Sequence, residues 1–299
     1  MSIYSQISGN KARTYLIIIL FIVLLTGFFY LIGKFVQSST SYLVIGLTFS
    51  LLSAVASYFY SDKIVLFTVG AKPANKKEHF DFYTVCENLA IADGLPMPKL
   101  YIMKDQSLNA FATGRDPKHA VICATTGILE KLNRTEIEGV IAHELSHVKN
   151  YDILLSSIVA VLVGTVALVS DWILRGFWWG GMGRDREERE NRNPILFVLL
   201  IVALLLAPLI ATIIQLAISR KREFLADASG ALLTRYPEGL ARALEKISND
   251  PNVLQSATTS TAHLFISDPL KKRRKTSWLV TLFSTHPPVT ERIRMLRSM

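Results

Sequence analysis

Four long apolar runs constrain the fold of this chain more than any other part of its sequence. They cover residues 15–33, 42–60, 153–174 and 195–218, and each has 19 to 24 residues. A helix of that length crosses a hydrocarbon core of about 30 Å. The runs also explain why half of the residues are hydrophobic and why the mean hydropathy reaches +0.32. The sequence therefore predicts an integral membrane protein with four transmembrane helices.

Composition argues against three other classes of protein. A signal peptide has an apolar core of about 7–15 residues, but the first run is longer and no small-x-small cleavage site follows it, so we expect it to stay as an anchor. Cys86 and Cys123 are the only cysteines, and two free thiols fit a reducing compartment better than a disulfide framework. The formal charge of +9 is typical of a positive-inside membrane protein, and we expect no nucleic-acid partner.

The basic residues predict which segments face the cytoplasm. Of the 33 Lys and Arg residues, 27 lie in segments 1–14, 61–152 and 219–299, and six lie in the turns that join paired runs. The positive-inside rule places these three segments in the cytoplasm of a multi-pass protein. Five arginines between residues 175 and 194 do not favour translocation of that loop. A re-entrant third and fourth segment is therefore the alternative.

This topology divides the chain into four parts. Residues 1–60 form an N-terminal membrane hairpin, and residues 153–218 form a second one. Residues 61–152 and 219–299 are then two halves of a single cytosolic domain. The predicted fold class is α+β, with four apolar helices and a small β-sheet in the cytosolic part.

The first cytosolic half alternates between strand and helix patterns. The expected strands are 63–69 and 99–103, and the expected helix is 76–93. Segments 109–114 and 119–125 flank a polar turn, which predicts a β-hairpin. An exposed strand of this hairpin can pair with an extended peptide through main-chain hydrogen bonds. An ordinary core hairpin is the alternative.

The motif His-Glu-Leu-Ser-His at residues 143–147 carries the clearest chemical signal. His143 and His147 are four residues apart, so on a helix both imidazoles project from one face and can bind one metal ion. Glu144 follows the first histidine, where its carboxylate can accept a proton from water without binding the metal. The motif therefore predicts a catalytic metal site.

A helix is expected around this motif. Thr135 and Glu138 have the form of a capping box, and no proline follows until Pro194. The predicted helix spans 135–150 and continues into the third apolar run. At 1.5 Å per residue, the metal would then lie roughly 10–15 Å from the bilayer.

A catalytic zinc needs a third protein ligand and one open position. The place six residues after His147 is Ile153, which lies inside an apolar run. Glu223 and Asp227 share one helical face just after the fourth run, and an antiparallel pair of spans would bring this face to the motif. Glu223 is thus a candidate ligand, and Asp227 a candidate acceptor for a ligand imidazole N–H. The alternatives are a solvated acidic face, or a ligand among His79, His119, His263 and His286.

The C-terminal tail carries two further clusters. His286 is held between polar residues and paired prolines, and Arg292 begins a predicted terminal helix that ends near Leu296. A histidine or arginine near the metal could stabilise the oxyanion of a tetrahedral intermediate, although a lone loop histidine is more often structural. The basic run 271–275 predicts a solvated loop, or a contact with anionic headgroups.

Four motifs together resemble one known family. They are His-Glu-Leu-Ser-His at 143–147, Asn-Ala-Phe-Ala-Thr-Gly at 109–114, Glu-Phe-Leu-Ala-Asp at 223–227 and Thr-His-Pro-Pro at 285–288. Two apolar runs precede the first of these helical motifs, and two more separate it from the glutamate. In this order and spacing the chain resembles the HtpX-type membrane metalloproteases of bacteria, which are relatives of the eukaryotic CAAX-processing prenyl-protein endopeptidase.

The resemblance implies a zincin-like endopeptidase with one Zn²⁺ per chain. By this likeness the zinc ligands are His143, His147 and Glu223, and Glu144 is the general base. Asp227 would accept a hydrogen bond from the imidazole N–H of a ligand histidine. The resemblance also assigns a substrate backbone contact to Asn109, Ala110, Phe111 and Ala112, and a place beside the site to His286 and Arg292.

The same likeness implies a biological setting. It predicts a bacterial inner-membrane protein whose active site faces the cytoplasm and which cleaves misfolded or damaged membrane proteins and other unfolded polypeptides. The basic run 271–275 resembles an insertion in a loop that the family varies. Oligomeric state and cleavage specificity do not follow from the sequence.

Two other hypotheses compete with this one. In an intramembrane protease of the site-2 type, the motif lies within the bilayer, but charged residues at 130–138 precede it. In a membrane chaperone or scaffold, the metal is structural. A structural zinc usually has four protein ligands and has no use for Glu144.

Overall fold

The structure is a computed structural model, and it describes residues 3–35, 37–180, 220–270 and 287–299. Three predictions lie outside the described residues: the fourth apolar run at 195–218, the basic run at 271–275, and the place of His286. The described part is mostly helical, with one small mixed sheet.

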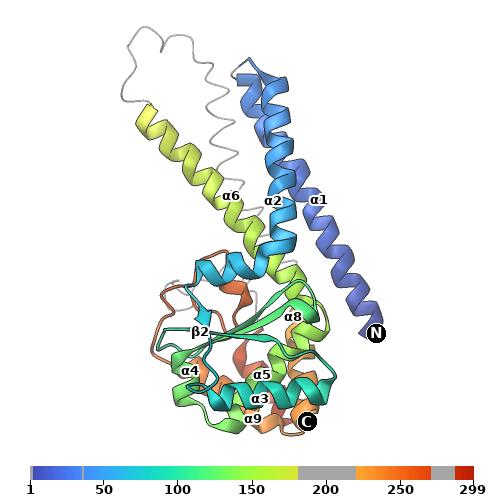
Figure 1. The fold of residues 1–299 in the computed structure, drawn as a ribbon, viewed down its shortest axis with the longest axis vertical. Helices are drawn as coiled ribbons and strands as arrows, with labels where there is room; N and C mark the ends of the chain where they lie inside the picture. The colour runs from blue at the N-terminus through green and yellow to red at the C-terminus, as the bar shows by residue number, and fades with distance from the viewer. Residues whose placement is uncertain (1–2, 36, 181–219, 271–286) are drawn as a thin grey trace.

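Three long helices extend from one end of a compact α/β part (Figure 1). They are α1 (Ile3–Phe35), α2 (Ser39–Thr68) and α6 (Asp152–Gly180). Each contains a stretch long and apolar enough to cross a membrane: Ile7–Lys34, Ser39–Thr68 and Asp152–Asp171. The first three predicted apolar helices are therefore present, and all three start or end several residues beyond the apolar runs.

The strand predicted at 63–69 is wrong, because these residues continue α2 as a helix. Val65, Leu66 and Val69 are all buried in one hydrophobic cluster with residues of the sheet. Their spacing of one, three and four residues matches one face of a helix. The packing of this face outweighs the β-branched content that favours a strand.

The four strands form a mixed sheet in the order β1-β2-β4-β3. The strands are β1 (Lys72–Pro73), β2 (Lys99–Met103), β3 (Ala110–Gly114) and β4 (Ala120–Thr125). β2 and β4 are parallel, whereas β1–β2 and β3–β4 are antiparallel. The strand at 99–103 and the hairpin are thus confirmed, and the turn between β3 and β4 contains the short 3₁₀ helix η1 (Pro117–His119).

The sheet is buried on both faces. Ile122 and Ala124 of β4 face the core of the soluble part, whereas Val121 and Cys123 face α2 and the start of α6. This alternation follows the two-residue period of a strand. Strands covered on both sides have no polar face, which explains why the hairpin sequence is almost entirely apolar.

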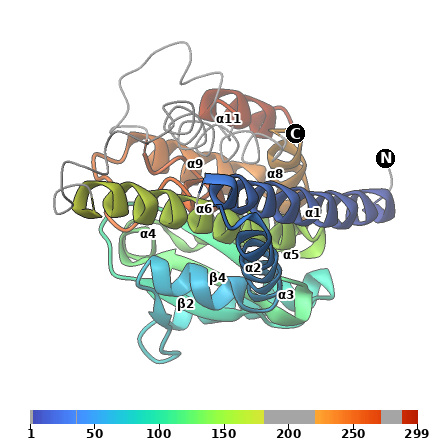
Figure 2. The same ribbon diagram turned by 90° about the horizontal axis from the view of Figure 1, so that it is seen from above.

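Helices cover the face of the sheet away from the membrane helices. Figures 1 and 2 show the sheet on one side and the C-terminal helices on the other. The helices on this side of the sheet are α3 (Phe80–Asp93), α4 (Thr126–Lys131), α5 (Arg134–Lys149), α8 (Arg220–Thr234), α9 (Pro237–Asn249) and α11 (Val289–Arg297). The 3₁₀ helix η3 (Ala262–Leu264) lies beside α6. The predicted helix 76–93 begins four residues late, and Gly94 ends it in the left-handed conformation with φ +68°. The terminal helix begins at Val289 rather than Arg292.

The motif helix α5 has a different cap from the one predicted. Its capping box is formed by Asn133 and Glu136, not by Thr135 and Glu138. The Asn133 side chain accepts a hydrogen bond from the Glu136 backbone, and the Glu136 carboxylate accepts one from the Asn133 backbone. Both pairs have the required three-residue spacing, so spacing alone does not choose between them.

The prediction that α5 runs straight into the third apolar run is also wrong. α5 ends at Lys149, and α6 starts at Asp152. Between them Tyr151 takes a left-handed φ of +58°, a conformation that interrupts an α-helix. The chain therefore turns at this point, and Asp152 is brought back toward the motif.

Candidate metal centre

The two motif histidines lie on one face of α5, as the four-residue spacing predicts. Their Nε2 atoms are 3.2 Å apart and their ring centroids 4.8 Å apart. His143 is fully buried, and the His147 side chain is 15% exposed. Both Nε2 atoms therefore point to the same small volume.

Glu223 brings a carboxylate to this volume from α8. Its Oε2 lies 3.8 Å from His143 Nε2, and its Oε1 lies 3.5 Å from His147 Nε2. Within the described residues, these three side chains form a group whose ligand atoms all lie within 4.8 Å of one another. Two ligands on a tetrahedral zinc, each about 2.0–2.1 Å from the ion, are about 3.3 Å apart. The donor types and their separations therefore fit a zinc ion.

A close helix contact makes this approach possible. α8 packs along α5 at Gly230, where an added Cβ would lie 3.0 Å from the backbone nitrogen of His143. No larger residue leaves the two backbones this near each other without a shift. Glu223 precedes Gly230 by two turns and Asp227 precedes it by one, on the side of α8 that faces the histidines.

His143 is supported by an ion pair that comes from two later helices. Its Nδ1 lies 2.9 Å from Asp227 Oδ1, and Arg292 of α11 binds the Asp227 carboxylate through Nε at 2.8 Å and Nη2 at 2.7 Å. Burial raises the pKa of Asp227, but the charge and hydrogen bonds of Arg292, together with His143, outweigh this and hold the pKa below its usual value. Asp227 is thus an anion that fixes the His143 ring.

Arg292 is fully buried, which is costly for a charged side chain without partners. Besides Asp227, it donates a hydrogen bond to the Ile266 carbonyl at 2.9 Å, and its Nη1 lies 3.6 Å from Glu223 Oε2. The resemblance placed Arg292 beside the site, and the structure places its guanidinium against Asp227, Ile266 and Glu223. Its guanidinium is occupied by protein groups in this structure.

His147 has a separate carboxylate partner that the sequence analysis missed. Its Nδ1 lies 3.0 Å from Oδ2 of Asp152, the first residue of α6. Burial lowers the pKa of His147, but the hydrogen bond to Asp152 and the charge of Glu223 outweigh it and raise the pKa to about 9. The only signal in the sequence was an acid five residues after the motif. On a continuous helix, the Asp152 side chain would point away from the face that carries His147.

Glu144 is buried beside the two histidines and is 2% exposed. Burial raises its pKa to about 7, although the nearby His147 and a backbone hydrogen bond from Ala112 of β3 act in the opposite direction. A carboxyl group with a pKa near neutrality can both accept and return a proton. Glu144 shares a cavity of about 30 Å³ with the histidines and Glu223.

The strand β3 forms one wall of this cavity and lies at the edge of the sheet. It is nonetheless fully buried, because the segment after η3 runs along its outer edge. Ile266 donates a hydrogen bond to the Ala110 carbonyl at 3.0 Å, and Phe111 forms an antiparallel bridge with Phe265. Each sequence-based hypothesis for the hairpin is therefore correct in one respect: β3 is an edge strand, and β3 is also packed in the core.

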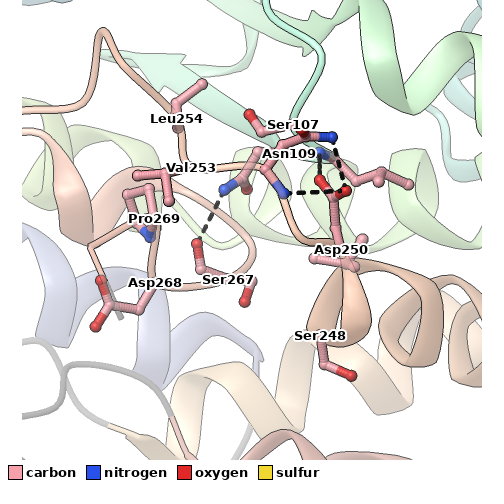
Figure 3. Close-up of a pocket in the computed structure, with 12 residues that line it drawn as sticks. Ser107, Asn109, Ser248, Asp250, Val253, Leu254, Ser267, Asp268 and Pro269 are labelled. Atoms are coloured by element: carbon pink, nitrogen blue, oxygen red, sulfur yellow. Dashed lines mark hydrogen bonds between the residues drawn. The ribbon is translucent and has the colours of Figure 1, made fainter. Parts of the chain in front are cut away.

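Asn109 lies in a neighbouring cavity of about 50 Å³ rather than in the one with the histidines (Figure 3). Its side-chain nitrogen donates to the Ser267 carbonyl at 3.0 Å. Its side-chain oxygen accepts from the Ala110 backbone at 3.2 Å. Its side chain therefore joins β3 to the segment that covers it. Ala110, Phe111 and Ala112 form the strand itself.

The other histidines considered as third ligands are placed differently. His263 lines the cavity that holds the two motif histidines, and its Nε2 lies 3.0 Å from the Ser156 carbonyl. His119 lies in the β3–β4 turn, where its Nδ1 is 2.8 Å from Asp116 Oδ1. His79 is the residue before α3. Among the described residues, Glu223, and none of these three histidines, forms a group with both motif histidines in which all ligand atoms lie within 4.8 Å of one another.

A HExxH helix packed against a mixed sheet, with a glutamate from a later helix facing both histidines, defines a membrane metallopeptidase. Residues 77–299 match Peptidase family M48, and the chain belongs to this family. This finding favours the enzyme hypothesis over a scaffold with a structural metal.

The chain is similar to bacterial proteases over its full length. It is 44% identical to the protease HtpX homologue of Thermoanaerobacter pseudethanolicus, over 100% of this chain and 98% of that protein. It is 45% identical to the HtpX homologue of Tropheryma whipplei strain Twist, over 99% and 98% of the two chains. The likeness to HtpX-type membrane metalloproteases expected from the motifs is confirmed.

Among solved structures, the chain is similar to the crystal structure of S. mikatae Ste24p. The TM-score is 0.49 and the sequence identity 19%. The match covers 91% of this chain and 62% of that one.

Proposed function

We propose that this chain is a zinc endopeptidase in which His143, His147 and Glu223 hold one Zn²⁺ and Glu144 is the general base. The separations of 3.2, 3.5 and 3.8 Å between the donor atoms are the observation that carries the proposal. Three protein ligands leave one position open, which is the arrangement of a catalytic zinc rather than a structural one.

The protein groups divide the chemistry of peptide hydrolysis among them. When bound, zinc supplies Lewis-acid polarisation of a carbonyl group and of water. Glu144 takes the proton from the attacking water and returns it to the leaving amine, a role that suits its pKa of about 7. Asp227 and Arg292 keep His143 in the orientation that points its Nε2 at the metal.

Substrate binding is proposed along β3. The Ala112 backbone lies beside Glu144, so a peptide that follows this edge would pass the general base. Ala110 and Phe111 are paired with Ile266 and Phe265, so a substrate using their edge has to displace that segment. Asn109 acts in this scheme by holding the strand, and His286 is proposed beside the site on the resemblance alone.

The proposed topology has four spans, with residues 1–14, 61–152 and 219–299 in the cytoplasm. Three described helices are long and apolar enough to span, and the fourth run has the same length and composition in the sequence. The distribution of basic residues supports this orientation. The protease part is then made of 61–152 and 219–299, and the membrane hairpins are 1–60 and 153–218.

We further propose that the substrates are misfolded or damaged membrane proteins and other unfolded polypeptides of a bacterial inner membrane. The support is the full-length likeness to HtpX homologues, together with a site close to the ends of membrane helices. A protease anchored in this way meets the lipid bilayer and the chains embedded in it. The positive charge is explained by membrane topology, and no nucleic-acid role is proposed.

The test uses three proteins purified in detergent: wild type, Glu144→Gln and Glu223→Ala. Wild type should bind one zinc per chain and cut an unfolded model protein. Glu144→Gln should keep the zinc and lose at least about 100-fold in turnover, because only the proton acceptor is removed. Glu223→Ala should lose both zinc and activity. Cleavage by Glu144→Gln at the wild-type rate would contradict the proposal.

A further inference from the structure

A buried asparagine on the first long helix reaches the metal centre. Asn10 of α1 is 4% exposed, and its side-chain nitrogen donates to Asp152 Oδ1 at 2.7 Å. Asp152 is also buried, at 4% exposure, and its other oxygen, Oδ2, faces His147 Nδ1 at 3.0 Å. One carboxylate therefore joins α1 to the imidazole.

The orientation of the Asn10 amide is fixed by its partners. Its nitrogen lies near two acceptors, Asp152 Oδ1 at 2.7 Å and the Asn150 carbonyl at 3.0 Å. Its oxygen lies 3.3 Å from Nη1 of Arg222, which is a donor. The opposite orientation would place two N–H groups against a guanidinium and an oxygen against two oxygens. Both amide hydrogens are thus committed to the turn between α5 and α6.

The position of Asn10 within α1 is unusual for an apolar helix. Ile17, Phe21 and Leu25 follow on the same helical face, and all three are buried against α6. Thr14 lies between them and Asn10, and its hydroxyl donates to the backbone of its own helix, at the Asn10 carbonyl. Asn10 differs from Thr14 because its side chain crosses to another element. A buried amide that crosses in this way loses free energy unless its partners are in place.

We propose that Asn10 is a positioning residue of the metal centre, which holds Asp152 so that Asp152 orients His147 toward the metal. The inference rests on the proposed zinc ligands. It goes beyond the matched family region, which begins at residue 77, because the group that completes the support of His147 comes from the N-terminal helix. Hydrogen bonds behind a ligand histidine set its tautomer and ring orientation, and removing them typically costs about 10–100-fold in metal affinity.

A consequence is reciprocal coupling between helix docking and metal binding. If the packed position of α1 strengthens metal binding, then bound metal must strengthen the packing of α1 by the same factor. The membrane hairpin is then part of the catalytic centre in the energetic sense, and not only its anchor.

The test uses the full chain in detergent. Zinc affinity is measured by competition with a chromophoric chelator, and the ligand field by the visible spectrum of the Co²⁺-loaded protein. Asn10→Leu removes the amide, and Asn10→Asp keeps its size but loses both N–H donors. Each should weaken zinc binding about 10-fold and shift the Co²⁺ bands. Thr14→Val is the matched control one turn along α1, and it should change neither.

A double variant shows whether Asn10 acts through Asp152. Asp152→Ala alone should weaken zinc binding at least as much as Asn10→Leu. The pair should be no worse than Asp152→Ala by itself, because the effect of Asn10 passes through that carboxylate. Full additivity overturns the proposal, and so does Asn10→Leu with zinc affinity and Co²⁺ spectrum within twofold of wild type. A fall in the melting temperature of the metal-free protein alone, with both metal readouts unchanged, shows a merely structural role and also overturns it.

Failure of this inference is distinct from failure of the proposed function. If Asn10 has no role at the metal, wild type still cleaves and Glu144→Gln still does not. If instead the zinc-loaded wild type never cleaves, the proposed function fails, whereas the metal affinities of the Asn10 variants still decide the present inference.

Discussion

The two motif histidines are held from different regions of the molecule. His143 is held from the soluble side by Asp227 and Arg292, in a bidentate ion pair between α8 and α11. His147 is held from the membrane side by Asp152, at the start of α6, with Asn10 of α1 behind it. The first support lies within the region shared with the peptidase family, and the second reaches outside it. The candidate metal site therefore lies between two parts of the chain.

The two supports also differ in their chemistry. Arg292 is fully buried with two hydrogen bonds to one carboxylate, so its charge has no access to water. His147 is supported by Asp152, which is bound in turn by the neutral amide of Asn10 and lies 3.4 Å from the Arg222 guanidinium. The His147 side chain is 15% exposed. Arg292 binds Asp227 through two short hydrogen bonds, whereas Arg222 lies 3.4 Å from Asp152 at a single atom, and the stronger a buried ion pair is, the more it costs to remove one partner. The soluble-side support should therefore be the more sensitive of the two.

The largest expected effect is on the soluble side. Arg292→Leu leaves the Asp227 and Glu223 carboxylates buried without their cation, and should cost about 3–5 kcal/mol of stability. Chemical denaturation of the metal-free protein measures it. Arg294→Leu on the same helix, at a side chain outside the core, is the control and should stay within about 0.5 kcal/mol. Equal losses for both variants would break the comparison.

Removal of the metal should have the next largest effect and should reach both regions. Zinc at about 1,000 times its dissociation constant stabilises the folded state by about 4 kcal/mol. A chelator should therefore lower the melting temperature and raise amide exchange in α8 and at the start of α6 together. Exchange that rises only in α8 would show that the membrane-side support is independent of the metal.

A smaller effect separates the two carboxylates directly. Asp227→Asn and Asp152→Asn each remove a charge from behind a ligand histidine, and each should weaken zinc binding about 10–100-fold. The Asp227 variant should be the more severe, because His143 is completely buried and its partner also carries the contact to Arg292. Zinc competition with a chelator measures both. A larger loss for Asp152→Asn would reverse the proposed ranking.

The smallest expected effect concerns the contact between α5 and α8 at Gly230. Gly230→Ala places a methyl group 3.0 Å from the His143 backbone nitrogen, so α8 must move by a few tenths of an ångström, at a cost of about 1–3 kcal/mol. Gly164→Ala in α6 is the matched control, because its nearest neighbour would lie 3.7 Å away. It should be neutral or stabilise by up to about 1 kcal/mol. Thermal melts of the metal-free variants compare them.

The sequence-based prediction of the candidate metal site rests on local rules. Four-residue spacing put His143 and His147 on one face, and the same spacing put Glu223 and Asp227 on another. Apolar length predicted three helices that the structure contains, and turn residues predicted the β3–β4 hairpin. The prediction that Glu223 lies beside the two histidines required one further step, the antiparallel pairing of spans.

The failures all concern places where tertiary contacts decide between equal local signals. Residues 63–69 have strand-like composition, but their helical face is covered by the sheet. Two capping boxes were possible at the start of α5, and the structure contains the one at Asn133, whose Glu136 also binds Lys246 of α9. The turn at Tyr151 contains no glycine or proline that would indicate a turn in the sequence. Because that turn was missed, Asp152 was missed too, and Asn10 could not be connected to a site 133 residues later.

The break at Tyr151 has a mechanical consequence. A membrane helix adjusts its tilt when the bilayer becomes thinner or thicker. If α5 and α6 were one rod, any such tilt would swing the motif helix and both imidazoles as a lever. The left-handed residue between them interrupts the rod, so a tilt of α6 reaches the motif through side-chain contacts at the start of α6, among them the contact of Asp152 with His147. A change in bilayer thickness would then reach the His147 imidazole directly, through Asp152.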